Sequence, residues 1–227
     1  MCGIVGIRDF RGGEPTSLEA IGRMTDCLAH RGPDDRGVFI DGAKGVAMGH
    51  QRLSILDLSK QGHQPMASEK KSLHITYNGE VYNFKEIQQE LIKHGKTFIS
   101  STDTEVILKA YEQWGMEAVR RFHGMFAFVL WDEKREQLIL CRDRAGVKPL
   151  YYYWKDGLLL AASELKAFHK HPKFQKSINV QALSLFLQFG YIPAPYTIFE
   201  DTYKLMPGTY RVFDKKGNSQ ETKYWDI

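Results

Sequence analysis

The order of the predicted strands and helices constrains the fold of this chain more than any other feature of its sequence. Apolar strand patterns form two groups, and a segment with helical periodicity separates them. The strand patterns lie at 3–8, 37–40, 45–50, 52–56, 73–77, 125–131, 137–142, 150–154 and 158–162. Parallel sheets need crossover helices between successive strands, and such regular alternation is missing here. The sequence therefore predicts an α+β fold of antiparallel sheets whose outer faces are covered by helices.

Capping and turn residues predict where several of these elements begin and end. A Thr or Asn three residues before a Glu forms a capping box, which marks the start of a helix. The chain has three such pairs: Thr16 with Glu19, Asn83 with Glu86, and Thr102 with Glu105. The dipeptide Asn78-Gly79 follows an alternating strand pattern and is typical of a two-residue hairpin turn. We therefore expect the chain to reverse at Asn78-Gly79.

Length and composition indicate one large domain, and no targeting signal is visible in the sequence. The 227 residues are expected to divide into a core at 1–170 and a segment at 171–227, with a helix, a Pro-rich loop and a hairpin, that completes it. The net charge is only +4 and the basic residues are dispersed, so neither a nucleic-acid nor a membrane partner is expected. No signal peptide or membrane-spanning apolar run is visible, which predicts a cytoplasmic location.

Cys2 is the residue whose position gives it the greatest potential for chemical reactivity. Removal of Met1 would leave Cys2 with both a thiol and a free α-amine. The α-amine titrates near pH ~7.7–8.0 and the thiol near ~8.5, so the amine can act as general base for its own thiol. On position alone, a simple terminal residue that leads into the first strand is the more common interpretation, and the rest of the chain must decide. The three cysteines match no disulfide framework and no zinc pattern, so no metal site is expected.

Seven short motifs carry a resemblance to a known family. They are MCGIVG at 1–6, HRGPD at 30–34, HQRLSI at 50–55, NGEVYN at 78–83, STDTEVI at 101–107, GMFAF at 124–128 and RDRAGVKPLYY at 142–152. In this order and spacing the chain resembles the N-terminal glutaminase domain of class II glutamine amidotransferases, in particular the glutamine-hydrolysing asparagine synthetase branch. The resemblance covers essentially the whole chain. It implies a four-layer αββα sandwich of the N-terminal nucleophile hydrolases, with two antiparallel sheets flanked by helices.

The resemblance also implies a role for individual residues. Cys2 is the nucleophile, and the Asn78 side-chain amide and the Gly79 backbone N–H form the oxyanion hole. Arg52 binds the α-carboxylate of L-glutamine, and Asp103 accepts its α-ammonium group. Further substrate-binding residues implied by the resemblance are Glu80, through its backbone, and Leu53, Ser54, Ile55 and Leu56.

The same residues also have ordinary interpretations. Arg52 alone is typical of a surface arginine in a strand, and Asp103 alone is an acid that the dipole of a helix favours in its first turn. No Asp is spaced to act as a catalytic partner of a histidine. We therefore expect His50 to pack at a strand end and His30 to belong to a helix-ending turn.

Arg31 and Asp34 lie in the second motif, and we expect them to support the loop of the active site.

By this resemblance the chain hydrolyses L-glutamine to glutamate and ammonia through a cysteine thioester, without a metal or cofactor. ATP and Mg²⁺ are expected only in a synthetase domain that uses the ammonia, either C-terminal or separate. This sequence lacks the phosphate loop of such a domain, and it stops directly after a predicted strand, so we expect a longer protein. A homodimer is a further expectation.

The acceptor of the ammonia stays open at this point. Aspartate is the default, and a sugar carboxylate or a β-lactam precursor are alternatives. Two other functions remain as well: an N-terminal nucleophile acylase that acts on another amide, and a non-catalytic docking or regulatory domain.

Overall fold

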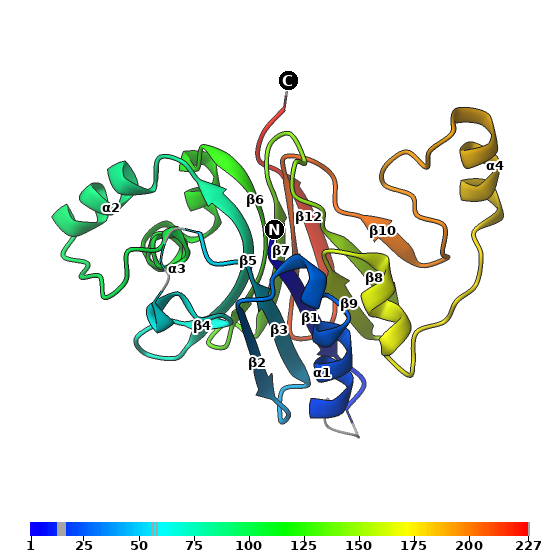
Figure 1. The fold of residues 1–227 in the computed structure, drawn as a ribbon, viewed down its shortest axis with the longest axis horizontal. Helices are drawn as coiled ribbons and strands as arrows, with labels where there is room; N and C mark the ends of the chain where they lie inside the picture. The colour runs from blue at the N-terminus through cyan, green and yellow to red at the C-terminus, as the bar shows by residue number, and fades with distance from the viewer. Residues whose placement is uncertain (13–16, 56, 58, 227) are drawn as a thin grey trace.

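The computed structural model describes residues 1–12, 17–55, 57 and 59–226, and two antiparallel six-stranded sheets form its body (Figure 1). Sheet A has the strand order β10-β8-β9-β1-β3-β2, and sheet B has the order β12-β11-β7-β6-β5-β4. The strands of sheet A are β1 (Gly3–Asp9), β2 (Asp35–Asp41), β3 (Val46–Arg52), β8 (Tyr151–Lys155), β9 (Leu158–Ala162) and β10 (Thr202–Lys204). Those of sheet B are β4 (Met66–Ala67), β5 (Leu73–Val81), β6 (Gly124–Asp132), β7 (Gln137–Arg142), β11 (Thr209–Phe213) and β12 (Ser219–Lys223).

Helices cover the outer face of each sheet. Helix α1 (Leu18–Asp26) packs on sheet A, and helices α2 (Phe84–Lys93) and α3 (Asp103–Trp114) pack on sheet B. Helix α4 (Val180–Phe189) stands apart from both sheets (Figure 1). Short 3₁₀ helices lie at Ala29–Arg31, Lys60–Gly62, Gly115–Arg121 and Leu165–Lys170. The predicted α+β class and the four-layer αββα sandwich are confirmed.

Strand β6 shows how the sequence builds the layers. Its side chains alternate between two buried environments, so the strand is apolar almost throughout. Phe126, Phe128 and Leu130 face the helices on sheet B, whereas Val129 and Trp131 face sheet A. Apolar packing on both faces makes β6 the centre of the molecule and a rigid base for the neighbouring strand β5.

The predicted hairpin turn at Asn78-Gly79 is wrong. Strand β5 continues through both residues, and Gly79 pairs with Phe126 of β6. A two-residue turn of the predicted type needs positive φ at its central residues, and Gly79 has no positive φ. A Cβ at Gly79 would lie 2.3 Å from the Met125 carbonyl oxygen, so glycine serves here for close approach of two strands.

The predicted strand at 52–56 is also wrong. Strand β3 ends at Arg52, and the chain then leaves the sheet, with Leu53 and Ile55 lining a cavity. Leu56, the last residue of that prediction, lies outside the described residues.

The three predicted capping boxes have different outcomes. Thr102 caps α3 as expected, with its hydroxyl accepting from the Glu105 backbone N–H. Asn83 makes no such bond to α2, because its side chain instead bonds to the segment after α3: it donates to the Arg121 carbonyl oxygen at 3.0 Å and accepts from the His123 N–H at 2.9 Å. Helix α1 is capped by Ser17, so the box starting at Thr16 is wrong. Thr16 itself lies outside the described residues.

The last part of the chain contributes strands to both sheets. Strand β10 pairs with β8 in sheet A, and β11 pairs with β7 in sheet B. Among the described residues, none of the helices has the length and apolar character that crossing a membrane requires.

Candidate active site

Most of the predicted site residues meet in one cavity of about 270 Å³. The cavity lies where β1 begins in sheet A and where β5 passes in sheet B. It is lined by Met1, Cys2, Arg52, Leu53, Ile55, Asp57, Gly62, Gln64, Tyr77, Asn78, Gly79, Glu80, Thr102, Asp103, Thr104, Met125 and Lys148. The predicted residue Ser54 lies beside the cavity without lining it. Leu56 cannot be placed, because it is outside the described residues.

The Cys2 thiol is held against the loop that follows β3. Its Sγ accepts from the Leu53 backbone N–H at 3.4 Å and lies 3.7 Å from the Leu53 carbonyl oxygen. The Arg31 guanidinium fixes the other side of the residue by donating to the Cys2 carbonyl oxygen at 2.9 Å. Burial raises the pKa of the Cys2 thiol, although the N-terminal ammonium group and Arg52 oppose this effect. The thiol therefore needs a base to become a nucleophile at neutral pH.

Asn78 offers a hydrogen-bond donor that no other described residue uses. The side chain is 2% exposed, and its Nδ2 atom has no hydrogen-bond partner among the described residues. A buried amide without a partner is costly, and such groups mark sites where a ligand completes the bonding. Asn78 and Gly79 line the same cavity as Cys2.

Arg52 is held from behind by backbone carbonyl groups. Its Nη1 atom donates to the Ser59 carbonyl oxygen at 3.0 Å, and Nη2 donates to that of Asp57. Gly62 makes room for this side chain, since a Cβ there would lie 2.0 Å from Nη2. The guanidinium is thus oriented at the cavity wall without a carboxylate partner among the described residues, which leaves its charge for a ligand.

Asp103 is the acidic counterpart of Arg52 in the cavity. Its Oδ2 atom accepts from the Tyr77 hydroxyl at 2.6 Å and from the Val81 backbone N–H at 2.9 Å. These two bonds tie the start of α3 to β5. Burial raises the pKa of Asp103, while the hydrogen bond from Tyr77 lowers it. Both a cationic and an anionic group therefore line one cavity with the thiol.

Two residues that support this arrangement were missed by the sequence analysis. In its local sequence, Tyr77 is one more residue of an alternating strand pattern. No pattern in the sequence indicates that its hydroxyl bonds to Asp103. Gln64 is buried and joins two elements: its Oε1 accepts from the Tyr77 backbone N–H at 2.7 Å, and its Nε2 donates to Thr104 Oγ1 at 3.2 Å. Only the pairing of β5 with distant segments brings these groups together.

The histidines have the structural roles that were expected. His50 is buried in β3, where Nδ1 lies 3.0 Å from Thr76 Oγ1, and burial lowers the pKa of His50 to about 3. His30 lies in the 3₁₀ helix after α1 and contacts Glu164 at 3.0 Å. Neither imidazole lines the cavity.

The supporting roles predicted for Arg31 and Asp34 have matching contacts. Arg31 bonds to Cys2 as described above and forms an ion pair with Glu164 at 2.8 Å. The Asp34 carboxylate accepts from the Ser54 backbone N–H at 2.8 Å, which holds the loop that contacts the thiol.

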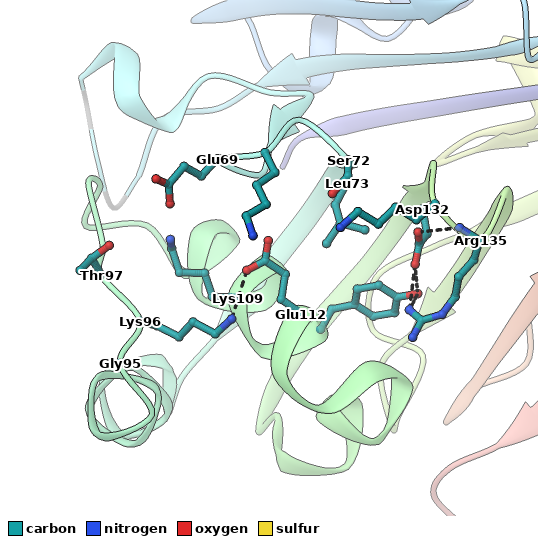
Figure 2. Close-up of a pocket in the computed structure, with 13 residues that line it drawn as sticks. Glu69, Ser72, Leu73, Gly95, Lys96, Thr97, Lys109, Glu112, Asp132 and Arg135 are labelled. Carbon is teal, nitrogen blue, oxygen red and sulfur yellow. Dashed lines mark hydrogen bonds and ion pairs between the residues drawn. The ribbon is translucent and has the colours of Figure 1, made fainter.

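A larger cavity of about 510 Å³ lies elsewhere, beside α3, and is lined by none of the predicted site residues that the structure describes (Figure 2). Its walls are charged, and ion pairs join Lys96 to Glu112 at 3.4 Å and Arg135 to Asp132 at 2.9 Å. In the part of the chain that the structure describes, no group of three His, Cys, Asp or Glu residues is arranged to hold a metal ion.

Comparison with known proteins places the whole chain in one family. The family profile described as "Glutamine amidotransferase domain" matches residues 1–225. A Methanocaldococcus jannaschii protein provisionally named asparagine synthetase (glutamine-hydrolyzing) 2 is 40% identical over 246 residues, which span 100% of this chain and 47% of that protein. Asparagine synthetase (glutamine-hydrolyzing) 3 of Bacillus subtilis is 38% identical over 100% of this chain and 37% of its own length.

The fold has solved counterparts as well. The structure of glutamine phosphoribosylpyrophosphate amidotransferase from B. subtilis superposes with a TM-score of 0.71 at 19% identity, over 99% of this chain and 49% of that chain. At this identity the likeness concerns the fold alone. The chain spans less than half the length of the curated relatives it matches. It is an enzyme domain that belongs to the glutamine amidotransferase domain family, of the kind found in proteins of the asparagine synthetase type.

Proposed function

We propose that this domain hydrolyses L-glutamine to glutamate and ammonia, with Cys2 as the nucleophile. The observation that carries the proposal is the buried Asn78 amide, which has no partner among the described residues and lines the same cavity as the thiol. An amide donor in that position suits the oxyanion that forms when a thiolate attacks an amide carbon. One such donor typically lowers the barrier by ~2.7–4 kcal/mol.

The base for Cys2 is its own α-amine, exposed when Met1 is removed. No histidine lines the cavity, and the Cys2 sulfur has hydrogen-bond contacts only with the Leu53 backbone among the described residues. The amine takes the thiol proton, the sulfur attacks the amide carbon of glutamine, and the proton passes to the leaving ammonia. Water then hydrolyses the thioester and releases glutamate.

Selectivity for a free amino acid comes from two opposite charges in the cavity. The Arg52 guanidinium suits the α-carboxylate of glutamine, and the Asp103 carboxylate suits its α-ammonium group. A peptide or acyl substrate lacks these two free groups, which argues against the acylase alternative. The complete set of thiol, donor and charged residues likewise argues against a non-catalytic domain.

The ammonia is proposed to serve an ATP- and Mg²⁺-dependent synthetase domain, C-terminal to this domain or separate from it. The names of the relatives support aspartate as the acceptor of the ammonia. These relatives are about two to three times longer than this chain, which leaves room for such a synthetase domain. One relative, amidase chry2 of Gibberella zeae, is 36% identical over 92% of this chain. Because this relative is named an amidase and not an asparagine synthetase, a different acceptor of the ammonia is kept as the alternative.

We propose that residues 171–227 complete the domain formed by residues 1–170 and meet the synthetase. Strands β10, β11 and β12 extend both sheets, which supports the first part of this proposal. Helix α4 exposes Val180, Leu187 and Phe189, and an apolar surface of this kind suits a protein partner. All three cysteines are free thiols, which supports a location in the reducing cytoplasm.

The test is glutamate release from glutamine by the purified domain, with its N-terminus determined by mass spectrometry. We expect release from the protein that lacks Met1 and none from Cys2→Ala. The control Cys27→Ala removes a half-buried thiol outside the cavity and should keep full activity. Full activity with Met1 still attached would refute the α-amine as base, and inactivity of the unmodified protein under all conditions would refute the proposed function.

A further inference from the structure

Lys148 is a charged residue of the cavity that the proposed mechanism does not use. The residue is only 6% exposed and lines the cavity of Cys2. Within the described residues, no carboxylate lies within ion-pair distance of its ammonium group and no acceptor bonds to it. Its ammonium nitrogen is not among the described buried atoms that lack a partner, so this group is open to the cavity. The cavity therefore offers a second cationic group that a bound anion can satisfy.

The strand order puts β8, the strand that follows Lys148, on the opposite side of β1 from β3, the strand of Arg52. Cys2 leads into β1, which lies between β3, the strand of Arg52, and β9 in sheet A. Lys148 belongs to the connection from β7 to β8, and β8 lies beyond β9 on the side away from β3. Its backbone N–H donates to Asp143 Oδ2 at 2.9 Å, and the same oxygen accepts from Phe126 N–H at 3.1 Å.

This position has a chemical meaning if glutamine binds as proposed. The α-carboxylate and α-ammonium groups lie at the end with Arg52 and Asp103, so the side chain extends past Cys2 towards Lys148. The side-chain amide of glutamine is neutral. Hydrolysis of the thioester adds water to the acyl carbon, breaks the C–S bond, restores the Cys2 thiol and leaves a γ-carboxylate after loss of one proton to the base. A new negative charge thus appears at the end of the cavity that contains Lys148.

We propose that the Lys148 ammonium group binds the γ-carboxylate of glutamate and the negative charge that develops as the thioester is hydrolysed. Glutamate is then held by three charged residues, whereas glutamine is held by two. This inference rests on the proposed function, since it assumes that glutamine occupies this cavity.

The test compares the affinities for the two amino acids directly. Cys2→Ala stops turnover, so calorimetry can measure binding of both glutamine and glutamate to one protein. We expect Lys148→Met in this background to weaken glutamate binding about tenfold, as for the loss of a hydrogen bond between charged groups. Glutamine binding should change less than about twofold. The control Lys134→Met removes an exposed lysine outside the cavity and should change neither affinity.

A second measurement separates binding from folding. Because no described residue pairs with the Lys148 ammonium group, Lys148→Met should leave the melting temperature nearly unchanged, and Lys148→Gln should repeat the binding result. Equal weakening of both ligands would mean that Lys148 contacts a group they share, and no change in either would mean no contact. Both results overturn the inference while the domain still hydrolyses glutamine. Absence of binding of either ligand, together with no hydrolysis by the unmodified protein, overturns the proposed function itself.

Discussion

At the scale of single residues, the cavity combines a buried thiol with polar groups that are unfavourable for stability. The Cys2 thiol has a pKa raised by burial, the Asn78 amide has no partner among the described residues, and Asp103 is a buried acid. The unpaired amide and the buried acid each cost folding free energy that a well-packed apolar residue would not. Their concentration in one place is typical of an active site, where strain and perturbed pKa values serve the reaction.

Replacing Asn78 should affect the chemical step more than substrate binding. Asn78→Ala removes a donor that contacts only the developing oxyanion, so we expect kcat to fall by about 10²–10³ with little change in KM. Steady-state kinetics of glutamate release measures both constants. The rate of Cys2 alkylation by iodoacetamide is the control and should be unchanged. A rise in KM at constant kcat would contradict the role proposed for Asn78.

Tyr77 should control how KM depends on pH. The α-ammonium group of glutamine pairs with ionised Asp103, so KM should rise as the pH falls through the pKa of this carboxyl. Burial has already raised that pKa, and the Tyr77 hydroxyl lowers it by stabilising the ionised form. Tyr77→Phe should therefore move the rise in KM to higher pH and leave KM similar at alkaline pH.

The control for this pH profile is Asp103→Asn, which should have a high KM without this pH dependence. The sign for stability follows from the same shift. The cost of ionised Asp103 is present above its raised pKa and disappears as the pH falls, so Asp103→Asn should increase the melting temperature at neutral pH. An unchanged KM profile in Tyr77→Phe would mean that its hydroxyl does not influence Asp103.

At the scale of elements, β5 organises the site. It carries Tyr77, Asn78 and Gly79 in succession, and alternation along a strand sends neighbouring side chains to opposite faces. Tyr77 thus reaches Asp103 on the helical side of sheet B, while Asn78 reaches the cavity beside Cys2. A one-residue shift of register would exchange the two faces. The close pairing of β5 with β6 at Gly79 is what fixes this register.

A side chain at position 79 should break this pairing. The Cβ of Gly79→Ala would lie 2.3 Å from the Met125 carbonyl oxygen and 2.6 Å from Phe126 Cα, and backbone cannot yield cheaply. We expect a loss of about 1–3 kcal/mol or more in unfolding free energy, as for other overpacked sites. Urea unfolding measures the change. The control Gly22→Ala lies within α1, where the nearest atom to the new Cβ is the flexible end of Arg36 at 3.4 Å.

Gly22→Ala should be neutral or should stabilise the protein by up to about 1 kcal/mol, because alanine restricts the unfolded chain and favours the helix. Equal destabilisation by both substitutions would mean that the contact with β6 is not what requires glycine at position 79.

At the scale of the whole molecule, the cavity with Cys2 and the exposed apolar surface of α4 are two separate features. The sandwich buries its apolar residues in three layers, between the two sheets and under the helices on each side. Helix α4 departs from this rule, since Ala182 is its one fully buried residue among those described. Leu187 is 77% exposed. Exposed apolar surface of this extent is typical of an interface.

A charge on α4 should therefore change the surface behaviour of the isolated domain without affecting its chemistry. We expect Leu187→Lys to reduce the binding of a hydrophobic fluorescent dye and to reduce any self-association seen by sedimentation, while kcat stays the same. The control Gln188→Lys adds the same charge at an exposed polar position of the same helix. Equal effects of the two substitutions would show that charge alone, and not the apolar face, is responsible.

The sequence by itself determined the fold class and the chemical identity of the site. Periodicity reports which faces of an element are buried, so the grouped strands predicted antiparallel sheets with outer helices, and the resemblance implied that there are two of them. The motifs indicated Cys2, Asn78, Gly79, Arg52 and Asp103, and all five line one cavity. Local patterns failed where a residue is used by a distant partner, as with the turn predicted at Asn78-Gly79 and the cap predicted at Asn83.

Only the tertiary structure decided how those residues are held and which groups remain free. The pairing of Asn78 with Ala127 across 49 positions of sequence turned an apparent turn into a strand. It also placed the Tyr77 hydroxyl on Asp103 and left the Asn78 amide without a partner among the described residues. The physical reason is that periodicity encodes burial but not partners. Which polar groups satisfy one another, and which stay available for a substrate, depends on contacts between segments far apart in the chain.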